Sequence, residues 1–182
     1  KMLKRKEFEK LFLPFNENGK QIWVITKVKE LPKPIIKMAL NLAELDFIKY
    51  INISNEALAA SSENYPKRPK VPITHMNHET AVGVQILYSV SYKYINFFDI
   101  NSPTKGNGSK MVDAILTGLP NDWQPTVVLD WSDGFWDRMK EKYKNYIEND
   151  CSFDTKSWVG IFCLLIVIAG VFGFLYEFIF YY

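Results

Sequence analysis

The segment 101–110, NSPTKGNGSK, has residue types and spacing suited to binding a charged ligand. Gly106 and Gly108 stand between an apolar, β-branched stretch and a stretch with helical periodicity. A glycine-rich turn at such a junction exposes several backbone N–H groups at a helix N-terminus, where a phosphate can be held. Lys105 and Lys110 bring positive charge to the same turn. The pattern therefore predicts a phosphate-binding loop, with a plain flexible turn as the alternative.

The flanking segments predict the elements that must position this turn. Val82–Val90 and Tyr92–Ile100 are rich in β-branched and aromatic residues, which favours two strands in the middle of a sheet. After the turn, Met111–Leu116 has a helical pattern, Thr126–Trp131 is typical of a strand, and Gly134–Ile147 is typical of a helix with one apolar face. The predicted order is two strands, glycine turn, helix, strand, helix.

With these elements, residues 82–147 resemble the GNAT superfamily of acyl-CoA-dependent N-acyltransferases. The central stretch of that family runs strand, pyrophosphate loop of the type Q/R-x-x-G-x-G/A, helix, strand, helix. The segments FFDINSPTKGNGSKMVDAIL and VVLDWSDGFWDRMKEKY are similar to it, and the loop matches at Gly106 and Gly108. Pro103 stands where the family usually has Gln or Arg. The resemblance implies an α/β fold with a mixed, mostly antiparallel sheet flanked by helices.

The resemblance also implies a cofactor, acetyl-CoA or another acyl-CoA, and acyl transfer to an amine of a small molecule or a protein. The pantetheine arm is expected to pair with the backbone near Ile100 and Ser102. The pyrophosphate is expected on consecutive residues of the glycine turn, which are Lys105, Gly106, Asn107, Gly108, Ser109 and Lys110.

Family members usually need a base that deprotonates the amine and an acid, often a tyrosine of the last helix, that protonates the departing thiolate. Tyr143 is the candidate acid, and core packing is its alternative role. The candidate bases are Asp99, at the end of the predicted central strand, and Glu79, just before the preceding strand. His75 and His78 beside Glu79 do not match a zinc-binding spacing, so no metal site is predicted.

The end of the chain predicts a membrane anchor. Residues 157–176, SWVGIFCLLIVIAGVFGFLY, form a run of about twenty residues without a formal charge, which is the length a helix needs to cross the hydrocarbon core. We therefore expect a domain at 1–150, a linker at 151–157 and a transmembrane helix at 158–182. Ala169 and Gly173, four residues apart, would allow two such helices to form a homodimer.

Charge and cysteine content predict where the domain resides. Lysines precede the apolar run and no Lys or Arg follows it, which favours a single-pass protein with a cytoplasmic N-terminal domain. The two cysteines of the chain, Cys151 and Cys163, cannot cross-link the domain with a disulfide, and this fits a reducing compartment. Lys and Arg number 22 against 20 for Asp and Glu, so the composition gives no reason to expect nucleic acid as a partner.

The first half of the chain predicts mixed α and β structure without a family resemblance. Helices are expected at Lys1–Phe12, ended by Pro14, and at Pro34–Leu45, with strands at Gln21–Val28 and Phe47–Ile53. The segment 61–72, SSENYPKRPKVP, predicts an exposed basic loop.

Two functions other than acyl transfer stay open from sequence. A non-catalytic, tail-anchored adaptor would present the domain to a protein partner, with Trp123 and Trp131 as an exposed aromatic patch. A membrane-surface protein would instead bind anionic lipid through Lys67, Arg68 and Lys70.

Overall fold

The computed structural model describes residues 1–127, 134–144 and 147–149 of the 182-residue chain. The linker predicted at 151–157, the anchor predicted at 158–182 and the part of the predicted strand Thr126–Trp131 beyond Val127 lie outside these residues. In the residues that are described, no helix is both long enough and apolar enough to span a bilayer.

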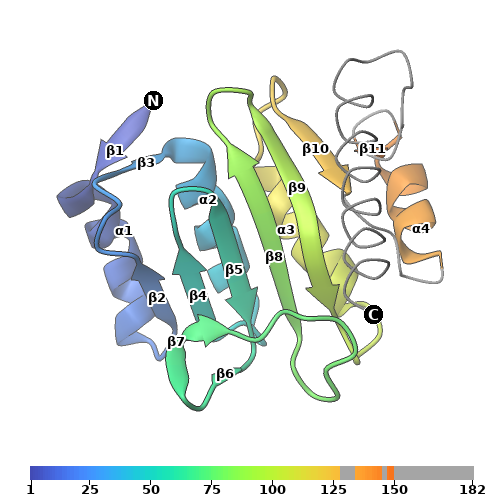
Figure 1. The fold of residues 1–182 in the computed structure, drawn as a ribbon, viewed down its shortest axis with the longest axis horizontal. Helices are drawn as coiled ribbons and strands as arrows, with labels where there is room; N and C mark the ends of the chain where they lie inside the picture. The colour runs from blue at the N-terminus through green and yellow to red at the C-terminus, as the bar shows by residue number, and fades with distance from the viewer. Residues whose placement is uncertain (128–133, 145–146, 150–182) are drawn as a thin grey trace, which may run out of the picture. The chain divides into compact units, whose positions relative to one another are not determined.

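A seven-stranded mixed sheet forms the centre of the domain (Figure 1). Its strands follow the order β11-β10-β9-β8-β5-β4-β2. The four middle strands, β4, β5, β8 and β9, pair antiparallel, while β2 pairs parallel to β4 at one end and β10 and β11 pair parallel at the other. The strands are β2 (Gln21–Val24), β4 (Tyr50–Ile53), β5 (Ala57–Ser61), β8 (Gly83–Ser89), β9 (Tyr94–Asn101), β10 (Gln124–Val127) and β11 (Glu148–Asn149).

Four described helices flank this sheet, and two short strand pairs complete the fold. The helices are α1 (Arg5–Glu17), α2 (Lys33–Ala43), α3 (Asn107–Gly118) and α4 (Phe135–Lys142). The additional strands are β1 (Met2–Lys4), paired with β3 (Glu30–Pro32), and β6 (Asn64–Tyr65), paired with β7 (Arg68–Pro72). The mixed α/β fold with a largely antiparallel sheet and flanking helices, as predicted from sequence, is confirmed.

The helices α2 and α3 lie side by side on one face of the sheet (Figure 1). Gly118 permits their close approach, because a Cβ atom there would lie 2.8 Å from the Cγ atom of Met38. Against these helices β8 presents Val84, Ile86 and Tyr88, which are buried and alternate with half-buried residues, as in a strand with one covered face. The core therefore lies between the sheet and this helical layer.

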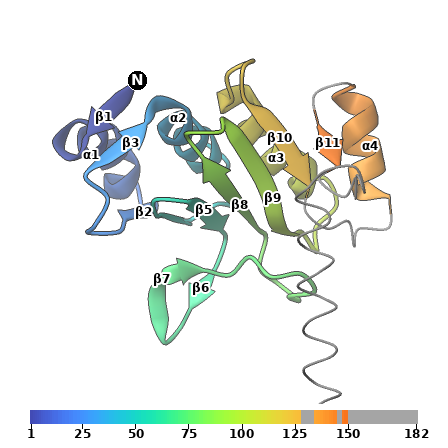
Figure 2. The same cartoon turned by 45° about the horizontal axis from the view of Figure 1, so that its top comes forward.

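The opposite face of the sheet carries the β6–β7 hairpin (Figure 2). The Asn52 side chain on β4 donates a hydrogen bond to the carbonyl of Lys70 at 2.7 Å, which fixes the hairpin to the sheet. The prediction of a loop at 61–72 was therefore wrong in part, since most of these residues form a strand pair. The prolines and lysines of this segment have low strand propensity, so the sequence did not predict the strands. Lys67, Arg68 and Lys70 are exposed, as expected.

Two other predictions are corrected by the structure. The helix α1 continues through Pro14 to Glu17, because its buried anchors Phe8 and Phe12 hold it to the core and outweigh the lost backbone hydrogen bond. Trp123 is only 7 % exposed, so it belongs to the core and offers no patch for a partner. Trp131, the second residue of that predicted patch, lies outside the described residues.

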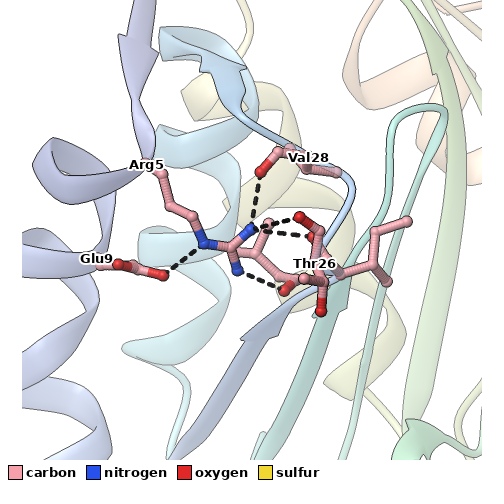
Figure 3. Close-up of polar contacts among 6 residues, drawn as sticks. Arg5, Glu9, Thr26 and Val28 are labelled. Atoms are coloured by element: carbon pink, nitrogen blue, oxygen red, sulfur yellow. Dashed lines mark hydrogen bonds and ion pairs between the residues drawn. The ribbon is translucent and has the colours of Figure 1, made fainter.

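Arg5 ties the N-terminal helix to the connection that follows β2 (Figure 3). Its Nη1 atom donates to the carbonyl oxygens of Ile25, Thr26 and Val28, at 3.2, 3.2 and 2.8 Å, and Nη2 donates to that of Val24 at 2.9 Å. The Nε atom pairs with Glu9 at 2.7 Å. One planar guanidinium thus satisfies four carbonyls at the end of β2 and in the irregular segment that follows it.

We expect Arg5→Lys to lower the free energy of unfolding by about 1–2 kcal/mol, because an ammonium has three donors and cannot reproduce the planar fork. Chemical denaturation of the full-length chain measures this. Lys10→Arg, an exposed change on the same helix, is the control and should shift stability by less than about 0.5 kcal/mol. Equal stability of the Arg5→Lys and parent proteins would show that the carbonyls are satisfied as well by water.

Candidate functional site

A hollow of about 390 Å³ opens where β9 ends and α3 begins. It is bounded by the end of β9, the glycine turn, the first turn of α3 and one side of α4. The lining residues are Ile100, Ser102, Thr104, Lys105, Gly106, Gly108, Ser109, Phe135 and Arg138. Six of the eight residues predicted from sequence to bind the cofactor are among them: Ile100, Ser102, Lys105, Gly106, Gly108 and Ser109.

Gly106 sets the direction of the turn. It is the residue before α3 and has φ +91°, a left-handed conformation that glycine adopts without a steric penalty. A Cβ atom at this position would have no neighbour within 4 Å. The backbone conformation, and not lack of space, therefore accounts for glycine here.

The backbone N–H groups of this turn divide into two sets. Those of Asn107 and Lys110 are used within the turn and the helix, by the carbonyls of Thr104 at 3.4 Å and Gly106 at 3.2 Å. Four others have no hydrogen-bond acceptor in the described part of the chain, namely those of Lys105, Gly106, Gly108 and Ser109. These donors all belong to residues that line the hollow, which is the arrangement that an anion requires.

The charge of the hollow is positive. Lys105 and Arg138 line it, and no carboxylate does among the described residues. Arg138 comes from α4 and was not predicted as a site residue, since nothing in the sequence indicates that the first turns of α3 and α4 share a cavity. Its guanidinium forms no ion pair with another described residue.

Gly108 and Phe135 are neighbouring residues in the lining of the hollow. A Cβ atom at Gly108 would lie 3.2 Å from the Phe135 ring, so the absence of a side chain lets α4 approach the turn. At the rim, the Ser102 hydroxyl donates to the carbonyl of Thr104 at 2.6 Å. Asn101, which is buried, donates through Nδ2 to the carbonyls of His78 and Ala81. These contacts fix the chain on both sides of the strand end.

Tyr143, the predicted acid, does not line the hollow. Its hydroxyl hydrogen-bonds to the carboxylate of Asp113 on α3, which also pairs with Lys142 at 2.7 Å. Burial, followed by the bond to Asp113, raises the pKa of Tyr143. Tyr143 is eight residues beyond Phe135, about 12 Å along a helix, and is therefore well away from the hollow. Its hydrogen bond to Asp113 instead holds the end of α4 to α3.

The two predicted bases occupy different environments. Asp99 lies on β9 opposite Gln85 and adjacent in sequence to Ile100, which lines the hollow. Burial raises the pKa of Asp99, and the nearby His75 opposes that shift. Glu79 is exposed in the loop before β8 and does not line the hollow.

His75 and His78 lie side by side with ring centroids 5.2 Å apart. The Nδ1 atom of His78 accepts the backbone N–H of Ala81 at 3.0 Å, so this ring caps a turn. In the described residues no group of three or more His, Cys, Asp or Glu side chains could hold a metal ion.

The raised pKa of Asp99 predicts the pH dependence of stability. The folded-state pKa of Asp99 lies above its unfolded value, so folding disfavours the ionised carboxylate. The free energy of unfolding is therefore lowered at pH values above the folded-state pKa, and this loss disappears at pH values below the unfolded pKa. Asp99→Asn should therefore raise the thermal midpoint at about pH 7 and leave it unchanged at about pH 3. The exposed Glu79→Gln is the control and should change neither midpoint. A lower midpoint for Asp99→Asn at about pH 7 would contradict the assignment.

No protein-family model, curated protein or solved structure matches this chain.

Proposed function

We propose that the chain is a membrane-tethered N-acyltransferase that takes the acyl group from acetyl-CoA or another acyl-CoA and transfers it to an amine. The observation that carries the proposal is the set of unpaired N–H groups of Lys105, Gly106, Gly108 and Ser109, which line a cationic hollow at the end of β9. The anchor in this proposal is the apolar segment 158–182.

The diphosphate of the cofactor fits the donors and charges of the hollow. Unpaired N–H groups at the start of α3 supply hydrogen bonds and the positive end of the helix dipole. Lys105 adds a mobile ammonium, and Arg138 adds a planar guanidinium that can bind two phosphate oxygens at once. The GNAT resemblance assigns the diphosphate to this turn.

The end of β9 bears on the placement of the pantetheine arm. The GNAT resemblance places this arm beside Ile100 and Ser102, and both residues line the hollow. In this proposal the extended, amide-bearing arm hydrogen-bonds to backbone groups beside Ile100.

Asp99 is the base that fits this arrangement best. Successive residues of a strand point to opposite faces, so Asp99 and Ile100 lie on the two sides of the sheet. The cofactor would then occupy the side of α3, and the amine would approach Asp99 from the side of the β6–β7 hairpin. A carboxyl with a raised pKa is better matched to accepting a proton near neutral pH. Tyr143 has a positioning role in this proposal.

Calorimetric titration of the full-length chain with coenzyme A tests the binding step. Arg138→Gln should weaken binding by about tenfold, because it removes one charge-assisted contact to phosphate. Lys10→Gln removes one positive charge on α1, away from the lining residues, and should leave the affinity within about twofold. Absence of binding at millimolar coenzyme A, or equal losses for both variants, would contradict the proposal.

Release of free thiol from acetyl-CoA in the presence of amines tests the transfer step. Asp99→Asn should reduce kcat by at least about a hundredfold while the affinity for coenzyme A is kept. Full turnover by Asp99→Asn would exclude Asp99 as the base. Binding without turnover for every amine would point to the adaptor function instead.

A further inference from the structure

A second hollow, of about 500 Å³, lies at the other end of the central strands. It is formed by the turn between β4 and β5 and the turn between β8 and β9. Its lining includes Tyr88, Tyr92, Tyr94, Asn55, Glu56 and Asn96. Tyr94 and Asn101 lie seven positions apart at the two ends of β9, about 23 Å of strand, so this hollow is distinct from the glycine turn.

Aromatic rings dominate one side of this hollow. The Tyr92 and Tyr94 rings stack with their centroids 6.4 Å apart and an angle of 21° between their planes. Tyr92 is 81 % exposed, the highest value among the exposed large hydrophobic side chains of the described chain. Tyr88 is buried, and its hydroxyl donates to the carbonyl of Ser54 at 2.6 Å. The exposed Tyr92 ring, stacked on the half-buried Tyr94 ring, therefore presents a π face to the hollow.

Glu56 is the one charged residue in the described lining. Its carboxylate is close enough to contribute, after burial, to the raised pKa of Tyr88. Lys93 lies beside Tyr92 in sequence but is held elsewhere, because its ammonium pairs with Asp122 at 2.8 Å. The hollow thus combines aromatic faces with an unneutralised negative charge.

Both turns that build the hollow are held in place. The N–H of Tyr88 donates to the carbonyl of Glu56 at 2.7 Å, which ties the turn between β4 and β5 to strand β8. Lys93 has φ +53°, and its carbonyl accepts the N–H of Gln124 at 2.9 Å. A non-glycine residue kept in this region indicates that its neighbours fix the turn.

We propose that this hollow binds a small organic cation of the alkylammonium class, with the cation against the Tyr92 and Tyr94 rings and its charge balanced by Glu56. An ammonium group is attracted to the negative face of an aromatic ring, and the attraction grows when a carboxylate lies nearby and water is partly excluded. Anionic ligands are disfavoured by the same carboxylate. Asn55 and Asn96 supply neutral hydrogen-bonding groups for the rest of the ligand.

Titration of the full-length chain, in a detergent with an uncharged head group, tests this with choline as the probe. The matched ligand is the neutral isostere of choline in which carbon replaces the ammonium nitrogen. Choline should bind about tenfold more tightly than this isostere, because shape is equal and only the charge differs.

Three variants separate the contributions of the rings and the carboxylate. Tyr92→Phe keeps the π face and should retain choline affinity within about twofold, whereas Tyr92→Leu should lose about fivefold to tenfold. Glu56→Gln should reduce the preference for choline over the isostere, and the preference that remains should depend on Tyr92. Far-UV circular dichroism of each variant verifies the fold.

Three results would overturn the proposal. The first is equal affinity for choline and its isostere, which would mean a merely apolar hollow. The second is no binding of choline at high millimolar concentration by a protein with parent-like circular dichroism. The third is Tyr92-dependent binding of a neutral monosaccharide together with no binding of choline. That result would mean that the rings bind carbohydrate.

Discussion

Parallel pairing between β9 and β10 is the constraint on which the candidate site depends. Two parallel neighbours cannot be joined by a tight turn, so the chain must cross over the sheet, and α3 makes that crossing. The same requirement between β10 and β11 produces α4. Right-handed crossovers toward the same edge place both helices on one face. Phe135 and Arg138 therefore reach the turn that begins α3, although they are far from it in sequence.

The elements around the glycine turn could be predicted because local signals agreed there. Apolar strand patterns, two glycines and a helical period all pointed to one order, and β8, β9, α3, β10 and α4 follow it. In the first half, tertiary packing overrode local chemistry. Pro14 did not end α1, and β5 was missed because the sequence ALAAS has little β-propensity but pairs on both sides with neighbouring strands.

The site itself was predictable only where it is contiguous in sequence. The turn residues were found because glycine spacing is a local signal, whereas Arg138 required knowledge of how α4 packs on Gly108. Tyr143 has a residue type suited to acid catalysis, but its environment is set by Asp113 on another helix. Which side chains share a cavity is decided by topology, and periodicity alone does not carry that information.

The Arg5 network also bears on how the sheet avoids self-association. The strand β2 forms one edge of the seven-stranded sheet, where unpaired backbone groups invite the addition of a strand from another molecule. The carbonyls of Val24, Ile25, Thr26 and Val28 already accept hydrogen bonds from a single guanidinium where β2 ends. The chain leaving β2 is not a strand from Ile25 to Lys29, so an incoming strand could not continue its pairing there. Arg5 thus leaves fewer free backbone acceptors for an incoming strand where β2 ends.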